Sequence, residues 1–347
     1  MDSLDNIKEY YGKVLQTNND LKTTACCTAA SIPLHLRDIL KQVHDEVMAK
    51  FYGCGSPIPF LDLEGKTVLD LGSGSGRDAY ILSKLVGPNG KVIGVDMTDE
   101  QLTVARRHQE YHQKAFGHPT SNITFVKGYI EDLKTANIAD NSIDLVVSNC
   151  VINLSPNKKK VFEEIFRVLK PGGELYFSDV FSDRRIPKNI ASNKVILGEC
   201  LGGALYTEDF RRIMQEVGCF DFRSMGKTKI EITNKEIANE TGNIQFYSIT
   251  IRAFKLPLED RCEDYGQVAY YLGSIPECPH RFELDDHHLF ETNKPMLVCS
   301  NTADMIGATH YKKHFTIIGN KENHLGLFDC GPTTGASAED CVTGACC

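Results

Sequence analysis

The chain has 347 residues, a formal net charge of −8 and 41% hydrophobic residues, a composition typical of globular proteins. This length favours two or three domains. The negative charge argues against a nucleic-acid partner, which requires a basic surface for its phosphates. The acidic N-terminus lacks the apolar run of a secretory signal, and no stretch of about 18 apolar residues could span a membrane. We therefore expect a cytoplasmic protein with no nucleic-acid or membrane partner.

The cysteine content is unusual, because the chain has 13 cysteines and no secretory signal. A disulfide framework is not expected in such a chain, which favours reduced thiols with a chemical role. The alternative is that most of them are small buried core residues. The sequence therefore has to indicate which thiols gather at a site.

The first 60 residues predict helices over 7–15 and 34–51, joined by a polar connection that holds Cys26 and Cys27. A Gly- and Pro-rich loop around Cys54 follows. From Gly65 onward, short apolar strands alternate with amphipathic helices. The predicted strands are 67–71, 91–96, 123–126, 143–148 and 174–178, and the predicted helices are 76–86, 100–116 and 158–169. This alternation is typical of an α/β fold with a mostly parallel, Rossmann-like sheet and helices on both faces.

Beyond Val180 the pattern weakens, with helices predicted over 184–197 and 207–217 and a strand over 244–256. The last 90 or so residues mix short apolar runs, aromatics and histidines, which favours a small α+β module. The expected parts are N-terminal helices and cysteine loops (1–60), a Rossmann-like domain (61–182), an acceptor-binding region (183–256) and a C-terminal module with a Cys-rich tail (257–347).

A glycine-rich loop, Asp70–Asp78, follows the first predicted strand and opens a helix. Glycines at 72, 74 and 76 let the backbone turn sharply and approach a ligand, because no Cβ intrudes. Asp96 ends the second strand about 20 residues later, where a carboxylate can accept hydrogen bonds from both ribose hydroxyls. Together these features predict a nucleotide site.

The spacing of this loop distinguishes between nucleotides. Dinucleotide folds use G-x-G-x-x-G and offer a bare helix N-terminus to a pyrophosphate, whereas this loop is G-x-G-x-G after Asp70. A carboxylate at position 70 would repel phosphate but attract the cationic end of S-adenosylmethionine. We therefore predict S-adenosylmethionine as the cofactor, ahead of a nicotinamide enzyme or a tight turn without a ligand.

Two later segments extend the predicted cofactor site. Ile130 and Glu131 follow the third strand, where they can flank the adenine. Asn149 and Cys150 end the fourth strand at the carboxyl edge of the sheet, where open α/β folds bind ligands. The whole region resembles class I methyltransferases. The expected cofactor contacts are Asp70, Gly72, Ser73, Gly74, Gly76, Arg77, Asp96, Met97, Ile130, Glu131 and Asn149.

The acceptor side lacks a general base, which a proton-bearing acceptor would require. Three histidines on or just after the second helix are expected to be solvated: His108, His112 and His118. Cys150 stands at the acceptor position instead. Cys54 and Cys200 are flanked by glycines in predicted loops, which favours exposed thiols, and three converging thiols make a soft-ligand site. Structural zinc is less favoured, because the sequence has no C-x-x-C pair.

Six segments, taken in order, resemble the arsenite methyltransferase family. They are residues 52–55 (YGCG), 70–78 (DLGSGSGRD), 94–98 (GVDMT), 148–153 (SNCVIN), 172–179 (GGELYFSD) and 198–206 (GECLGGALY). The resemblance implies that Cys54, Cys150 and Cys200 bind trivalent arsenic and that Cys150 and Cys200 hold the methylated intermediate. It also implies a fourth cysteine in the N-terminal segment. Cys26 and Cys27 compete for that place, and the residues that follow favour Cys27.

The chemistry of arsenic agrees with the missing base. Trivalent arsenic bound by thiolates keeps a lone pair that can attack a methyl group with no proton to remove, although binding itself releases protons from the thiols. The resemblance implies that enzyme thiols then restore the trivalent state. A disulfide involving Cys26 or Cys27 would remain, for thioredoxin or glutathione to reduce. Arsenite and methylarsenite are the expected substrates, in arsenic detoxification, and we expect a monomer.

The sequence indicates less beyond residue 256. Four cysteines there are interpreted as core residues: Cys262, Cys278, Cys299 and Cys330. Three more lie on the polar tail, where they either capture arsenite or form an incidental exposed cluster: Cys341, Cys346 and Cys347. His287 and His288, beside two aspartates, are expected to form a solvated polar turn rather than a metal site.

The residues alone leave two other functions open. One is methyl transfer to a small organic acceptor such as a quinone or a sterol, which would need an apolar acceptor pocket and would tolerate Cys150→Ser. The other is a thiol-rich metalloid sensor with a vestigial cofactor fold. The complete glycine loop and Asp96 argue against the sensor.

Overall fold

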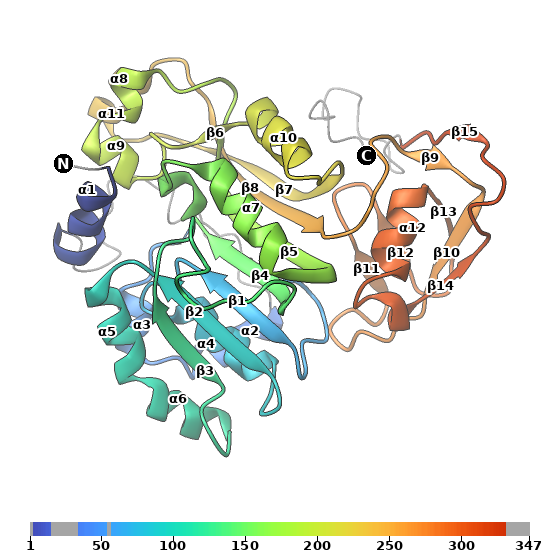
Figure 1. Cartoon of the computed structure of the whole chain (residues 1–347), viewed down its shortest axis with the longest axis horizontal. Coiled ribbons are helices and arrows are strands. Elements are labelled where there is room, and N and C mark those ends of the chain that lie inside the picture. The colour runs from blue at the N-terminus through green and yellow to red at the C-terminus, as the bar shows by residue number, and fades with distance from the viewer. Residues whose placement is uncertain (1–2, 15–33, 54–56, 331–347) are drawn as a thin grey trace.

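The computed structural model describes residues 3–14, 34–53 and 57–330. Figure 1 shows a central sheet with helices on either face, and a smaller C-terminal body beside it. The cysteines at 26, 27, 54, 341, 346 and 347 lie outside the described residues. Within the described ranges, no helix has the length and apolar character needed to cross a membrane.

The central sheet has eight strands, seven of which follow the order β3-β2-β1-β4-β5-β8-β7. They are β1 (Thr67–Leu71), β2 (Lys91–Asp96), β3 (Ile123–Lys127), β4 (Ile143–Asn149), β5 (Leu169–Ser182), β7 (Phe222–Ile230) and β8 (Phe246–Phe254), with β6 (Leu205–Tyr206) paired to β5. β1 to β5 are parallel to one another, β8 is antiparallel to β5, and β7 is antiparallel to β8. The predicted fold class is confirmed. The strand order reverses between β1 and β4, which is where such sheets open a ligand crevice.

Helices cover both faces of the sheet because adjacent strand residues point to opposite sides. Val68 belongs to a core shared with α2, α3, α4 and α5, whereas its neighbour Leu69 belongs to a core shared with α7 and α10. The bounds are α2 (Leu34–Leu40), α3 (Asp45–Ala49), α4 (Arg77–Leu85), α5 (Asp99–Arg107), α6 (Gln109–Phe116), α7 (Lys158–Val168) and α10 (Thr207–Glu216). These two cores fix the carboxyl ends of β1 and β4 relative to each other.

Three predicted helices are each divided in two. The predicted helix 34–51 is interrupted after Leu40, and the helix 100–116 is interrupted at His108. The helix predicted over 184–197 is replaced by α8 (Lys188–Ala191) and α9 (Lys194–Gly198). The helical spacing of apolar residues continues across each interruption, so this spacing does not reveal where a helix ends.

The expectation that the three histidines are solvated is wrong. His108, His112 and His118 are 7%, 1% and 8% exposed. The His112 ring stacks on Tyr80 at 3.5 Å between centroids and accepts a hydrogen bond from the His44 backbone N–H, in the segment between α2 and α3. Burial lowers the pKa of His112 to about 4. The N-terminal helices cover this surface, which cannot be read from α5 and α6 alone.

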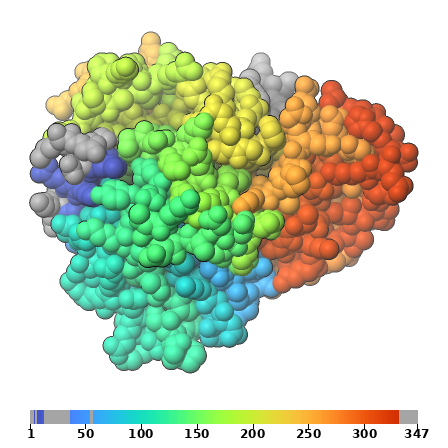
Figure 2. Space-filling model, in the orientation of Figure 1, coloured from blue at the N-terminus to red at the C-terminus, as the bar shows by residue number. Residues whose placement is uncertain are grey.

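The C-terminal part is a small α+β body, as the sequence predicts. Its strands pair as β10 (Gln267–Tyr271) with β13 (Pro295–Val298) and β14 (Phe315–Ile318), β11 (Arg281–Glu283) with β12 (Leu289–Glu291), and β9 (Glu263–Asp264) with β15 (Gly326–Leu327). α12 (Ser300–Gly307) packs on β10 and β14. In Figure 2 its orange and red residues abut the green and yellow ones of the sheet. Phe254 of β8 lies in one core with Tyr271 and Tyr311 of this body.

The turn predicted to be solvated at 285–288 is partly buried instead. Asp285 is 2% exposed and lies 2.8 Å from Nδ1 of His288 and 3.3 Å from the guanidinium of Arg223. Burial alone would raise the pKa of Asp285, but His288 and Arg223 hold it well below its usual range. The sequence could not indicate this contact, because Arg223 comes from β7, far away in the chain. The contact between Arg223 of β7 and the turn at 285–288 therefore joins the C-terminal body to the sheet.

Candidate active site

The predicted glycine loop crosses the carboxyl end of β1 and faces β4. Gly72 and Gly76 have φ angles of +68° and +94°, a backbone region that favours glycine. A Cβ on Gly72 would lie 2.4 Å from the Val151 side chain, so a larger residue does not fit. Asp96 accepts hydrogen bonds from the backbone N–H groups of Gly74 (2.9 Å) and Thr98 (2.8 Å), which ties the loop to the end of β2.

A pocket lies at these strand ends. Ten of the predicted cofactor or acceptor residues line it: Asp70, Gly72, Ser73, Gly74, Asp96, Met97, Ile130, Glu131, Asn149 and Cys150. Gly76 and Arg77 are not among its lining residues. The Arg77 guanidinium stacks on the Phe51 ring at 3.7 Å and lies 3.3 Å from Asp78, which in turn accepts a hydrogen bond from Asn149. Arg77 therefore supports the wall of the pocket from behind.

Asp70 is the most strongly perturbed carboxyl group of the pocket. It is 3% exposed, and its Oδ2 has no hydrogen-bond partner. Burial, together with the nearby charges of Asp78 and Asp96, raises its pKa well above its usual range. Ser73 Oγ and Gln101 Oε1 are also buried without a partner. Buried polar atoms without a hydrogen-bond partner cost free energy, which a bound ligand can recover by supplying the partner. Because one of these atoms belongs to a carboxylate, a cationic ligand is favoured. The residues present therefore fit the sulfonium and amino groups of S-adenosylmethionine.

The N-terminal side of the pocket was not predicted. Ile7, Tyr11 and Phe51 line it, the first two from α1 (Ser3–Glu9) and the π-helical turn η1 (Tyr10–Val14). The amide of Gln101 on α5 donates to the Tyr11 carbonyl at 3.2 Å, which docks the turn over the glycine loop. The hydroxyl of Ser155 donates to Glu131 on the opposite wall. The helical spacing of residues 7–15 is visible in the sequence, but where that helix docks is not.

Cys150 and Cys200 meet at the wall of the pocket although 50 residues separate them in the chain. The Cys200 thiol donates to the Cys150 carbonyl at 3.2 Å, and the Tyr11 hydroxyl lies 3.7 Å from the same sulfur. Both cysteines have left-handed backbone, with φ of +56° and +62°. Such conformations cost about 1–3 kcal/mol in residues other than glycine and cluster at functional sites. The sulfur of Cys150 is disulfide-bonded in this structure.

The expectation that the Cys200 thiol is exposed is wrong, because Cys200 is 0% exposed; Cys150 is also buried, at 3%. The N-terminal turn covers them: Tyr10 donates to Glu199 and Tyr11 to the Gly198 carbonyl, at 2.8 and 2.7 Å. The two other predicted thiols, at 27 and 54, lie outside the described residues. Gly53, next to Cys54 in the sequence, lies against Asn149, since a Cβ on Gly53 would be 2.7 Å from the Asn149 amide.

Two buried charges lie close to the thiols. Burial raises the pKa of Asp179 to about 7, despite hydrogen bonds from Val180 and Asn153. Burial also lowers the pKa of Lys158, which is near Asp179 and Cys200. The Asn153 amide donates to Asp179 at 2.7 Å. These contacts hold the turn after β4, which carries Cys150, against the end of β5.

Comparisons with known proteins agree with this geometry. A family model described as a methyltransferase domain matches residues 62–218. An arsenite methyltransferase of Aquipseudomonas alcaligenes is 51% identical over 347 residues, which is 99% of this chain and 99% of that one. The chain belongs to the arsenite methyltransferase family. The arsenite methyltransferase of Homo sapiens is 43% identical over 321 residues, covering 91% of this chain and 84% of its own.

Among solved structures, an arsenic(III) S-adenosylmethionine methyltransferase from Chlamydomonas reinhardtii superposes with a TM-score of 0.83 and 53% identity. The match covers 86% of this chain and 100% of that one. Membership of the family confirms the class I methyltransferase fold and S-adenosylmethionine as the cofactor. The role of each individual residue stays a prediction.

Replacing Asp70 by Asn is expected to weaken S-adenosylmethionine binding by about 10- to 100-fold, because a charge-assisted contact contributes about 1.5–3 kcal/mol. The wild-type affinity should also fall as the pH is lowered. Only ionised Asp70 attracts the cationic cofactor, and its raised pKa means that protonation begins at a higher pH than for an ordinary carboxyl group. Titration calorimetry over a pH series measures both effects.

The matched control is Asp140→Asn, because Asp140 is exposed and paired with Arg167 away from the pocket. It should leave the affinity and its pH dependence unchanged. An Asp70→Asn variant that binds the cofactor as tightly as the wild type, with the same pH profile, would contradict this role.

Proposed function

We propose that the chain transfers methyl groups from S-adenosylmethionine to trivalent arsenic held by the thiolates of Cys54, Cys150 and Cys200, giving mono- and further methylated arsenicals. The observation that carries the proposal is the contact between Cys200 and Cys150 at the wall of the cofactor pocket. The position of Gly53 against Asn149 supports the third thiol, because Cys54 follows Gly53 in the sequence.

The residues divide into a cofactor side and an acceptor side. Asp70 would hold the cationic end of the cofactor, Asp96 its ribose, and Ile130 and Glu131 its adenine. Bound there, the cofactor supplies an electrophilic methyl group. The described part of the acceptor side excludes water, because Cys150 and Cys200 are buried and the N-terminal turn covers them.

Arsenite binding needs no external base. As(OH)₃ exchanges its three hydroxyls for three thiols and releases three waters, so that each thiol proton leaves with a hydroxyl group. The arsenic lone pair would then attack the methyl carbon as the carbon–sulfonium bond breaks to leave the neutral thioether, and no proton has to be removed. This agrees with the pocket lining, in which none of the described residues is a histidine. Soft thiolates are also the ligands that discriminate in favour of a soft metalloid over a hard cation.

Methyl transfer raises arsenic to the pentavalent state, and two electrons must return it to the trivalent state. We propose that two enzyme thiols supply them and become a disulfide, with Cys27 or Cys26 as one partner and thioredoxin or glutathione as the reductant. We also propose that the enzyme acts as a monomer in arsenic detoxification. Turnover that stops after one or two methyl groups without added thiol, and resumes with it, is the expected signature.

The deciding experiment incubates the protein with arsenite, S-adenosylmethionine and a thiol reductant, and separates arsenic species by mass spectrometry. Methylarsenite followed by dimethylated species is expected. A Cys219→Ser variant is the control, because Cys219 is a buried thiol that does not line the pocket. Reduced protein that binds the cofactor but yields no methylated arsenic would refute the proposal.

A further inference from the structure

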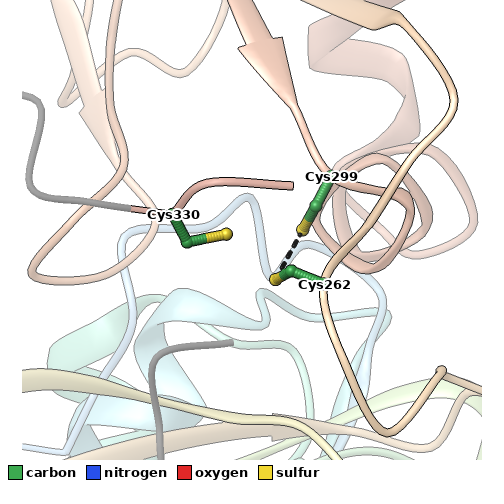
Figure 3. A group of neighbouring side chains, drawn as sticks. All are labelled: Cys262, Cys299 and Cys330. Atoms are coloured by element: carbon green, nitrogen blue, oxygen red, sulfur yellow. Dashed lines mark hydrogen bonds between the residues drawn. The ribbon is translucent and has the colours of Figure 1, made fainter. Parts of the chain in front are cut away.

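Three cysteines of the C-terminal body converge on one point away from the candidate active site. The sulfurs of Cys262, Cys299 and Cys330 all lie within 4.8 Å of one another, and those of Cys262 and Cys299 are 3.1 Å apart. Figure 3 shows Cys262 and Cys299 facing each other and the Cys330 side chain pointing toward them. None of the three lines the cofactor pocket. We call this group the C-terminal thiol cluster.

The fold builds this cluster from three separate segments. Pairing of β9 with β15 brings the chain around Cys262 beside the chain that leads to Cys330, and the Phe328 N–H donates to the Cys262 carbonyl at 2.8 Å. Cys299 is the N-cap residue of α12. These thiols are 37 and 31 residues apart along the sequence, so their spacing gives no motif. The expectation that they are only core residues does not explain why their sulfurs converge.

The surroundings suit a thiolate ligand set. Cys262 and Cys299 are 5% and 0% exposed, whereas Cys330 is half-buried. The Cys299 sulfur accepts a hydrogen bond from the Thr302 N–H at 3.4 Å and lies 3.3 Å from the Thr302 hydroxyl. The Arg223 guanidinium donates to that hydroxyl at 3.2 Å. Donors of this kind orient a metal-binding sulfur from behind.

We infer that the C-terminal thiol cluster, once reduced, is a second binding site for trivalent arsenic, separate from the site of methyl transfer. Three ligands match the three bonds of trivalent arsenic. Structural zinc takes four ligands, and within residues 3–14, 34–53 and 57–330 no histidine or carboxylate joins this group. Binding replaces the three hydroxyls of As(OH)₃ by three sulfurs and releases three waters, with no change in oxidation state.

Reduction must come first, because Cys262 and Cys330 are disulfide-bonded in this structure. A phosphine reductant converts each disulfide and one water into two thiols and a phosphine oxide, and it does not compete for arsenite as a dithiol would. The redox state therefore controls whether the site exists. The site stores arsenite on the enzyme in reducing conditions and loses that capacity on oxidation.

The test uses the full chain with Ser at positions 26, 27, 54, 150, 200, 341, 346 and 347, so that the proposed catalytic thiols and the tail thiols are absent. The phosphine-reduced protein is mixed with arsenite and desalted, and arsenic per chain is measured by plasma mass spectrometry. About one arsenic per chain is expected, falling at least tenfold with Cys262→Ser or Cys299→Ser added. X-ray absorption should show three sulfur neighbours.

Cys278→Ser is the matched control, since Cys278 is a free, half-buried thiol of the same body outside the cluster. Binding of the cofactor checks that each variant is folded. In the otherwise wild-type chain, the single substitution Cys299→Ser should lower the bound arsenic by about one per chain. Undiminished arsenic in the Cys262 and Cys299 variants, or displacement of arsenite by equimolar Zn²⁺, would overturn the inference. Because the catalytic thiols are absent from this chain, the outcome is independent of whether the wild type methylates arsenic.

Discussion

Replacing Cys200 by Ser is expected to reduce arsenite methylation at least about 100-fold while leaving S-adenosylmethionine affinity within about twofold. A hydroxyl is a hard ligand and does not replace a thiolate on arsenic. The fold should survive, because a serine hydroxyl can still donate to the Cys150 carbonyl as the thiol does at 3.2 Å. Steady-state methylation and cofactor titration of the same preparation measure the two quantities.

A comparison with Cys54→Ser sharpens this test. Methylarsenite has two exchangeable hydroxyls and needs two thiolates, so Cys54→Ser should lose arsenite methylation but keep that of methylarsenite. Cys200→Ser should lose both. If Cys200→Ser keeps half of the wild-type rate, or if its cofactor affinity falls together with its activity, Cys200 is not an arsenic ligand.

The cofactor half of the site could be predicted because its determinants are local. Asp70 and the glycines follow directly from a strand, and Asp96 ends the next strand, so parallel pairing alone brings them to one edge. Nine of the predicted cofactor residues line one pocket for this reason. The exceptions are Gly76 and Arg77, which do not line it. The direction of the Arg77 side chain depends on Phe51, from a segment whose docking the spacing does not fix.

The acceptor half depends on contacts between distant segments. Tyr11 reaches Cys200 across 189 residues, and a sequence pattern contains no record of such a contact. Glycine neighbours made Cys200 look exposed, but the N-terminal turn buries it. The burial of His112 likewise depends on a distant segment, because His112 is covered by the region of α2 and α3, which precedes the sheet in the chain. The strand end and the glycine neighbours had singled out Cys150, Cys54 and Cys200, and the family resemblance added their arsenic-binding role and the N-terminal cysteine.

Removing the Arg252 side chain is expected to destabilise the protein by about 3–5 kcal/mol, because it leaves a buried carboxylate unpaired. Arg252 and Glu174 are 1% and 0% exposed, and their Nε and Oε1 atoms are 2.7 Å apart. Burial would raise the pKa of Glu174, but Arg252 and His310 keep it below its usual value. Arg252 also donates to Tyr311 at 3.0 Å and to the Leu284 carbonyl, so one side chain of β8 joins the sheet to the C-terminal body.

Urea unfolding followed by circular dichroism measures the loss in Arg252→Ala, and an Arg252→Met/Glu174→Leu double variant separates its causes. An apolar pair avoids the unpaired charge, so the double variant should be clearly more stable than Arg252→Ala. Arg185→Ala is the control, since the ion pair of Arg185 with Asp209 is exposed and its loss should not be measurable. If the double variant is as unstable as Arg252→Ala, the lost free energy of unfolding comes from the packing of the Arg252 side chain and not from the unpaired charge of Glu174. Because Tyr311 follows α12, whose N-cap is Cys299, weakening this junction should also lower arsenite retention at the C-terminal thiol cluster.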